Sequence, residues 1–210
     1  MESERQEDEV GTPATAGTAY AERLSRLSGQ GWKQRLDVQA PYRANIERLT
    51  LGRTLDVGCG IGRNLAYLSS ESVGVDHNPH SIKVARDRGL SAYTTEEFLA
   101  DSDLAKLGTF DSILAAHLVE HVQLDEAVAI LASYVPLVRP HGRVVLICPQ
   151  ESGFKSDDTH VAFSDFAVLR DLSTRLGLEF QHEYSFPFPR SFGRVFRYNE
   201  FVHISRTPEA

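Results

Sequence analysis

The chain has little cysteine and lacks any apolar run long enough to cross a membrane. Only two of its 210 residues are cysteines, Cys59 and Cys148, and both lie in apolar or glycine-rich surroundings. Two such thiols fit buried positions in a reducing compartment better than a disulfide framework. The longest apolar runs, such as 144–148, have the length of a strand and cannot span a bilayer.

Positive charge is also scarce, because 22 Lys and Arg face 29 Asp and Glu and the net charge is −7. Binding along a nucleic acid backbone needs clustered cations that replace counterions, so the composition disfavours a long nucleic acid partner. Residues 1–9 are polar and acidic, without the apolar core of a signal peptide. We therefore expect a cytoplasmic monomer or homodimer with no membrane partner, acting on a small molecule.

Length and composition predict one well-packed α/β domain, since 41% of residues are hydrophobic and 24% are charged. We expect a disordered acidic tail over 1–18, an N-terminal helical cap over 19–50 and the main domain over 51–210. Pro41 fits the first turn of a helix over 41–49, where its missing N–H has no intrahelical partner to lose.

From residue 54 onward, strand-like and helix-like segments alternate. The predicted strands are 54–57, 72–75, 91–94, 110–115 and 143–148, and the helices between them are 63–69, 81–88, 96–107 and 124–137. Such alternation predicts a parallel sheet covered by helices on both faces. A loop over 149–159, a helix over 164–176 and two strands, 179–186 and 197–204, complete the expected fold.

A glycine-rich turn follows the first predicted strand, in the order Asp56, Gly58, Gly60 and Gly62. Glycine lets the backbone turn tightly and approach a ligand closely. We expect a helix to start at about Arg63 and to present unpaired N–H groups to that ligand. The spacing is not the G-x-G-x-x-G of dinucleotide sites. A carboxylate at Asp56 would repel a pyrophosphate but would favour a cationic amino group.

An acid, Asp76, ends the second predicted strand, 18 residues after Gly58. An acid at this place can accept hydrogen bonds from both hydroxyls of a ribose. The alternative is an ordinary β–α turn with a helix-capping Asp. The order of strand, glycine turn, helix, strand and acid favours the nucleotide-like ligand.

The segment 55–62 resembles motif I of the class I S-adenosylmethionine-dependent methyltransferases, and 74–76 resembles their ribose-binding acid. The resemblance covers roughly residues 41–182. It implies a Rossmann-like, seven-stranded, mostly parallel sheet with helices on both faces and an antiparallel last strand. It also implies S-adenosylmethionine as the cofactor. The implied contact residues are Asp56, Gly58, Cys59, Gly60, Gly62, Asn64, Asp76, His77, Thr95, Glu96, Ala116 and His117.

Within that resemblance, Asp56 would reach the methionine amino group, Asp76 would hold the ribose and His77 would lie beside the adenine. Thr95 and Glu96 follow the third strand, where relatives place an adenine-binding residue, often Asp. The usual Gly-Asp pair is absent here. The alternative for Glu96 is a helix N-terminal acid that interacts favourably with the helix dipole.

A constellation of His117, Glu120 and His121 follows the fourth predicted strand. On a helix their spacing would place them on one face. They could form a zinc site, a magnesium site like the E-x-x-E-H of some O-methyltransferases, or a metal-free pocket wall. His117 replaces the first Glu of that pattern, and a hard cation prefers oxygen ligands, so we predict no metal.

Methyl transfer needs a deprotonated or neutral nucleophile aligned with an activated methyl group. A histidine with a pKa near neutrality can act as the base. His121 and, second to it, His117 are therefore our catalytic candidates.

An aromatic turn, Phe186-Pro187-Phe188-Pro189-Arg190 with Phe192, joins the last two strands. It could line an apolar substrate pocket or pack the edge of the sheet. We predict a methyltransferase that acts on an O, N or C nucleophile of a small molecule. The alternatives are a non-catalytic cofactor-binding module, a tRNA or protein methyltransferase, and a nicotinamide oxidoreductase.

Overall fold

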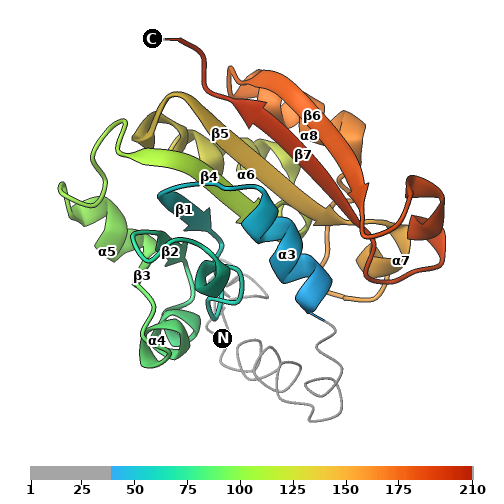
Figure 1. The fold of residues 1–210 in the computed structure, drawn as a ribbon, viewed down its shortest axis with the longest axis horizontal. Helices are drawn as coiled ribbons and strands as arrows, with labels where there is room; N and C mark the ends of the chain where they lie inside the picture. The colour runs from blue at the N-terminus through green and yellow to red at the C-terminus, as the bar shows by residue number, and fades with distance from the viewer. Residues whose placement is uncertain (1–38, 210) are drawn as a thin grey trace, which may run out of the picture.

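The computed structural model describes residues 39–209, and within them one seven-stranded sheet has the order β3-β2-β1-β4-β5-β7-β6 (Figure 1). The strands are β1 Thr54–Val57, β2 Val73–Asp76, β3 Ala92–Thr94, β4 Phe110–Ala116, β5 Val138–Pro149, β6 Glu179–Phe186 and β7 Glu200–Arg206. The Rossmann-like fold predicted from the sequence is confirmed.

Strands β1 to β5 pair in parallel, and β7 lies antiparallel between β5 and β6. Leu55 of β1 is in register with Val73 on one side and with Ile113 on the other. Continuous apolar strands of this kind are typical of a parallel sheet buried on both faces. The predicted antiparallel last strand is confirmed.

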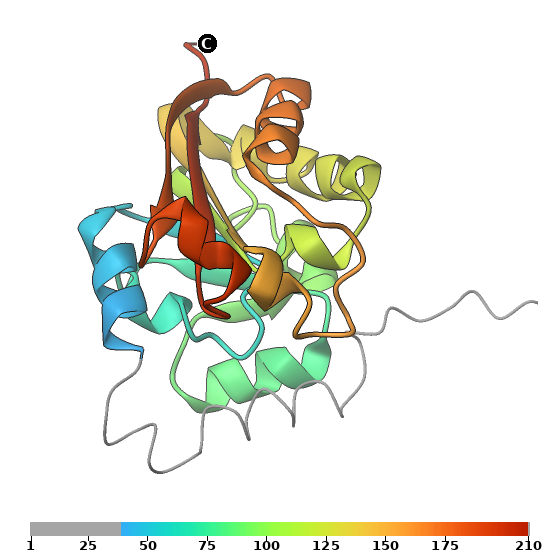
Figure 2. The same cartoon turned by 90° about the vertical axis from the view of Figure 1, so that its right-hand side faces the viewer.

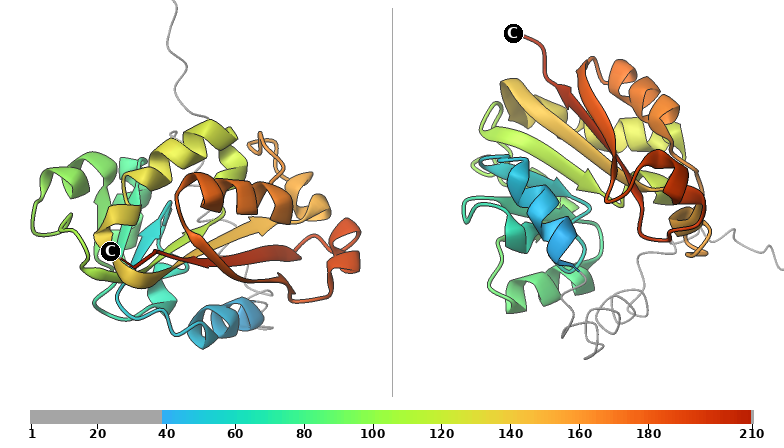
Figure 3. Two further views of the ribbon diagram at one scale, coloured as in Figure 1. Left: turned by 90° about the horizontal axis from the view of Figure 1, so that it is seen from above. Right: turned by 45° about the vertical axis from the view of Figure 1, so that its right-hand side comes forward.

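Helices cover both faces of this sheet (Figures 2 and 3). The α-helices are α3 Ala40–Arg48, α4 Pro79–Asp87, α5 Thr95–Ala100, α6 Leu124–Ala132, α7 Glu151–Phe154 and α8 Phe166–Arg175. Four single-turn 3-10 helices are η1 Leu65–Tyr67, η2 Val119–His121, η3 Val135–Leu137 and η4 Arg190–Arg194. One core cluster joins α5, α6 and α8 to one sheet face, and two others join α3, η1 and α4 to the opposite face.

Helix starts are set by local caps. Asn78 caps α4 by accepting from the backbone N–H groups of His80 and Ser81 at 3.0 and 3.2 Å. Asp165 caps α8 by accepting from two amides of its first turn. Such caps satisfy N–H groups that a helix leaves unpaired at its start.

Several predicted boundaries are wrong. The segment 63–69 forms only the 3-10 turn η1, and 96–107 forms the shorter α5. The loop expected over 149–159 contains α7. The turn after the glycines ends at Leu68, whose extended backbone (φ −88°, ψ 175°) does not continue a helix.

The expected tail over 1–18 and most of the expected cap over 19–50 lie outside the described residues. The described part of the cap is α3, which begins with Ala40 and Pro41, close to the predicted start. No helix within 39–209 combines the length and the apolar character that crossing a bilayer would require.

We expect Gly62→Ala to lower the free energy of unfolding by about 2 kcal/mol or more. A Cβ at Gly62 would lie 2.4 Å from Leu90 Cδ1, and its φ of +78° is itself unfavourable for Ala. Denaturant unfolding measures the loss. Gly89→Ala is the matched control, because Gly89 has φ +79° but nothing within 4 Å of a Cβ. Equal losses in the two variants would contradict the proposed clash with Leu90.

Candidate active-site cleft

A cleft of about 930 Å³ opens at the carboxyl ends of β1, β2 and β4. Open α/β sheets place ligands at this edge. The predicted site residues that line it are Gly58, Cys59, Gly60, Asn64, Asp76, His77, Thr95, Glu96, Ala116, His117 and His121. Of the predicted cofactor residues, Asp56 and Gly62 do not line it. Gly62 packs against Leu90 and Ala85 instead, so its glycine serves packing.

The glycine turn has positive φ at all three glycines, +75° at Gly58, +53° at Gly60 and +78° at Gly62. A Cβ at Gly58 would lie 3.1 Å from the Leu118 side chain across the turn. Glycine therefore keeps this wall of the cleft open.

Asp76 is held in a fixed orientation by two backbone amides. Gly60 N–H donates to its Oδ2 at 2.8 Å, and Asn78 N–H donates to its Oδ1 at 2.8 Å. These bonds join the glycine turn to the end of β2. His77, with 45% of its side chain exposed, lies beside this carboxylate.

Asp56 lies below the turn and is fully buried. Burial and the nearby charge of Asp76 raise the pKa of Asp56 to about 7, while the hydrogen bond from the Leu65 amide opposes this rise. Its Oδ2 has no hydrogen-bond partner among the described residues. A buried acceptor without a hydrogen-bond partner is energetically costly, so this oxygen favours binding of a ligand that donates a hydrogen bond to it.

Thr94 caps α5 in a capping box with Glu97, whose carboxylate also pairs with Arg86. This arrangement leaves Thr95 and Glu96 on the cleft. Tyr134 lines the cleft as well. The acid that serves the helix start is thus Glu97.

His117 lies between two carboxylates. It has φ +60°, its Nδ1 is 3.0 Å from Glu120 Oε1, and its Nε2 is 3.0 Å from Glu200 Oε1. Burial lowers the pKa of His117, but the bonds and charges of Glu120 and Glu200 outweigh it and raise that pKa to about 10. The ring is therefore a fixed imidazolium at neutral pH, which does not favour its candidacy as a base.

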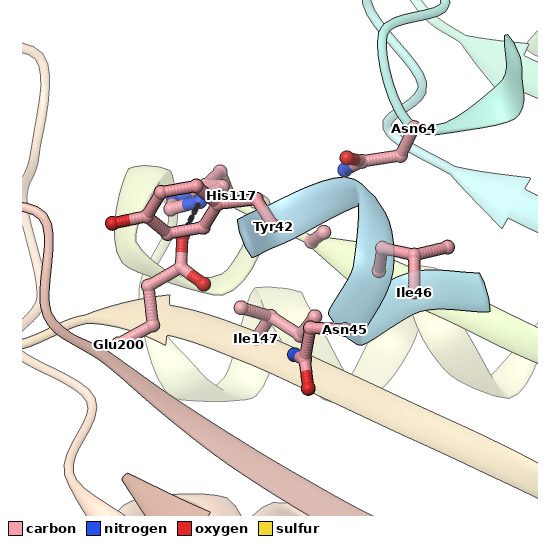
Figure 4. Close-up of a pocket in the computed structure, with 8 residues that line it drawn as sticks. Tyr42, Asn45, Ile46, Asn64, His117, Ile147 and Glu200 are labelled. Atoms are coloured by element: carbon pink, nitrogen blue, oxygen red, sulfur yellow. Dashed lines mark hydrogen bonds and ion pairs between the residues drawn. The ribbon is translucent and has the colours of Figure 1, made fainter. Parts of the chain in front are cut away.

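A second, water-sized cavity of about 20 Å³ lies beside His117 (Figure 4). Tyr42 and Asn45 of α3 and Glu200 of β7 close it, and Asn64, Ala116 and His117 line both this cavity and the cleft. Tyr42 donates its hydroxyl to the Tyr198 carbonyl at 2.7 Å. Burial and the Glu200 charge raise the pKa of Tyr42 well above its usual value.

Sequence reasoning missed Glu200 as a residue of this site. Glu200 is 83 positions from His117 in the chain. It reaches His117 because β7 runs antiparallel beside β5 and begins opposite Pro149. No local pattern signals that pairing.

His121 hydrogen-bonds to a backbone carbonyl, whereas His117 pairs with carboxylates. The His121 Nδ1 lies 3.2 Å from the Thr159 carbonyl, which favours the tautomer with its lone pair on Nε2. Burial lowers the pKa of His121, so the ring is neutral at neutral pH. These properties suit the base role predicted for His121.

The residues that could ligate a metal in the structure are not the three that the sequence spacing suggested. Ligand atoms of Glu120, His121 and His160 lie within 4.8 Å of one another, whereas both nitrogens of His117 are committed to carboxylates. Two nitrogens and one oxygen match Mg²⁺ poorly. The His160 Nδ1 already donates to the Phe154 carbonyl at 2.8 Å. The absence of a metal stays a prediction.

Comparison with known proteins matches a family described as "Methyltransferase domain" to residues 55–146. A ubiquinone biosynthesis O-methyltransferase of Xanthomonas oryzae pv. oryzae is 34% identical over 101 residues, covering 45% of this chain and 41% of that protein. The match thus spans less than half the length of that curated relative.

Two solved structures are similar over most of their length. Magnesium protoporphyrin IX methyltransferase from Synechocystis PCC 6803, with bound SAH, has a TM-score of 0.64 at 16% identity, covering 93% of this chain and 97% of that one. An N-methyltransferase from Bradyrhizobium japonicum has a TM-score of 0.62 at 18% identity, covering 81% and 97%. At these identities the likeness shows a shared fold.

Replacing Glu200 by Gln should lower the pKa of His117, because one of its two carboxylates loses its charge. We expect at least a tenfold drop in proton affinity, about one pKa unit.

Folding raises the pKa of His117 to about 10. The contribution of His117 to the free energy of unfolding is therefore complete below about pH 6.5 and is lost as the pH rises through 10. NMR titration of the ring and unfolding at several pH values measure both effects. Glu179→Gln, on exposed β6, is the control; an unchanged pKa in Glu200→Gln would contradict the pairing.

Proposed function

We propose that the chain is a class I methyltransferase, as the domain match over residues 55–146 supports, and that it transfers the methyl group of S-adenosylmethionine to an O, N or C nucleophile of a small molecule. The observation that carries the proposal is the grouping of an open glycine turn, a fixed Asp76 and an unsatisfied Asp56 oxygen at one end of the cleft.

The residues present fit this cofactor. Asp76, held by two amides, would accept from the ribose hydroxyls. The lone Oδ2 of Asp56 would receive the methionine amino group directly or through water. Gly58, without a side chain, leaves room for close approach, and Thr95 and Glu96 would border the adenine.

The same geometry disfavours a dinucleotide. A pyrophosphate needs unpaired N–H groups at the start of a helix. Here Gly60 N–H is already used by Asp76, and only the 3-10 turn η1 follows the glycines. A nicotinamide oxidoreductase is therefore a poorer fit than a methyltransferase.

S-adenosylmethionine, when bound, supplies a methyl group already activated on a sulfonium. The chain has to orient the acceptor and manage its proton. His121, neutral and with its lone pair on Nε2, would accept that proton. His117, fixed as a cation by Glu120 and Glu200, would shape the wall beside the acceptor.

The nature of the acceptor atom is left open by the relatives, whose names include an O-methyltransferase, an N-methyltransferase and a porphyrin-precursor enzyme. A small-molecule acceptor is favoured by the net charge of −7 and by a cleft large enough for more than one ligand. A tRNA or protein acceptor and a non-catalytic module are the alternatives.

Calorimetric titration tests the cofactor. We expect S-adenosylmethionine and S-adenosylhomocysteine to bind and NAD not to bind. Asp76→Ala should weaken binding about tenfold or more, since it removes charge-assisted hydrogen bonds to the ribose. Asp87→Ala, an exposed acid on α4, is the matched control. Tight NAD binding, or full affinity in Asp76→Ala, would overturn the assignment.

Transfer of tritium from labelled S-adenosylmethionine into a metabolite extract separates an enzyme from a binding module. We expect incorporation, and about a hundredfold slower incorporation in His121→Ala at unchanged cofactor affinity. His182→Ala, on exposed β6, should behave as the unmodified chain. If no extract fraction gains label while the cofactor binds, the module alternative is favoured; if His121→Ala keeps full rate, His121 is not the base.

A further inference from the structure

The connection between β6 and β7, residues 187–199, does not line the cleft, which was one of the two roles that the sequence suggested for it. It projects at the edge of the sheet beside α7 (Figures 1 and 2). Phe188, Phe192, Val195 and Tyr198 are 43%, 47%, 78% and 52% exposed. We call these four side chains the aromatic face. They are four of the nine large hydrophobic side chains that are exposed among residues 39–209.

This exposure is not the result of a loose loop. The buried Asn199 accepts from Phe188 N–H at 2.9 Å and donates to Ser185 Oγ and Gln150 Oε1 at 2.9 and 3.0 Å. A Cβ at Gly193 would lie 1.9 Å from Gln150 Oε1, so only glycine fits there. The polar groups of the segment thus form hydrogen bonds inside it, while its apolar side chains face the solvent. Exposing apolar surface to water is unfavourable for folding.

Charge on this segment opposes that of the whole chain. Residues 187–199 contain three arginines and no acid, whereas the chain carries a net charge of −7. Arg190 pairs with Glu151, but Arg194 and Arg197 are exposed and form no ion pair within the described part of the chain. Cations beside exposed aromatic groups are complementary to an anionic, partly apolar surface.

The rings are arranged for partition into a lipid interface rather than for stacking on bases. Phe188 packs against Phe192 and Phe196 at centroid distances of 5.5 and 5.0 Å, and Arg197 lies over the Tyr198 ring at 5.8 Å. Stacking on single-stranded nucleic acid requires open ring faces. Residues 187–199 offer cations but no acid, so a partner surface that is anionic throughout is the better match. Apart from Ser191, the outward side chains here are apolar or cationic.

We propose that the aromatic face, with Arg194 and Arg197, docks the chain on the anionic headgroup layer of a membrane. Insertion of side-chain tips needs no spanning helix. The face lies at the carboxyl edge of the sheet, and Glu200 of the small cavity follows it directly in the chain. Docking would therefore bring the acceptor side of the cleft to the lipid surface.

Vesicle sedimentation with the full chain tests this proposal. We expect the chain to sediment with vesicles of phosphatidylcholine mixed with phosphatidylglycerol, less with phosphatidylcholine alone, and less at higher salt. Arg194→Gln with Arg197→Gln should weaken binding to the mixed vesicles about tenfold, and Phe192→Ser with Val195→Ser should do the same. Thermal melting confirms that each variant is folded.

Lys106→Gln with Leu107→Ser is the matched control, since it removes one cation and one exposed apolar side chain between α5 and β4. It should bind vesicles as the unmodified chain does, as should Asp76→Ala, which separates this proposal from cofactor binding. The proposal is overturned if the chain stays in the supernatant with both vesicle types or if the loop variants bind as well as the control. It is also overturned if a labelled single-stranded RNA binds in place of vesicles and is lost in the same variants.

Discussion

A protonated imidazole held between two carboxylates joins the two halves of this molecule. His117 ends the parallel half of the sheet, Glu120 lies in the turn that follows, and Glu200 begins the antiparallel half. Removing His117 would leave the fully buried Glu120 carboxylate without its charge partner, which is more costly than the pair is favourable. The positions of Ala116, of the small cavity and of the start of β7 all depend on this arrangement.

The rest of the cleft is organised by backbone groups. Amides of Gly60 and Asn78 hold Asp76, the Leu65 amide meets Asp56, and the Thr159 carbonyl sets the tautomer of His121. Main-chain groups are positioned by the fold itself, so they fix acidic and basic side chains without the entropy cost of ordering long partners. Such an arrangement keeps a reaction site oriented before a ligand arrives.

The succession of strands along the chain, the glycine turn, and the places of Asp76 and His121 followed from local sequence patterns, because each pattern reports a turn, a cap or a strand end nearby in the chain. The His117–Glu200 pair did not, because it depends on the register of β7 against β5. The spacing of His117 and His121 also misled, since a positive φ at His117 ends β4 and the single turn η2 replaces a helix. His160 therefore replaces His117 in the possible metal group.

Both cysteines of the chain are buried, Cys59 within the glycine turn and Cys148 in β5. Burial raises the pKa of each thiol well above its usual value, so both stay protonated and react slowly. A cysteine introduced on the surface would then be the one fast-reacting thiol of the chain. Spectroscopic labels can thus be attached at a single chosen position, without first removing either native thiol from the core.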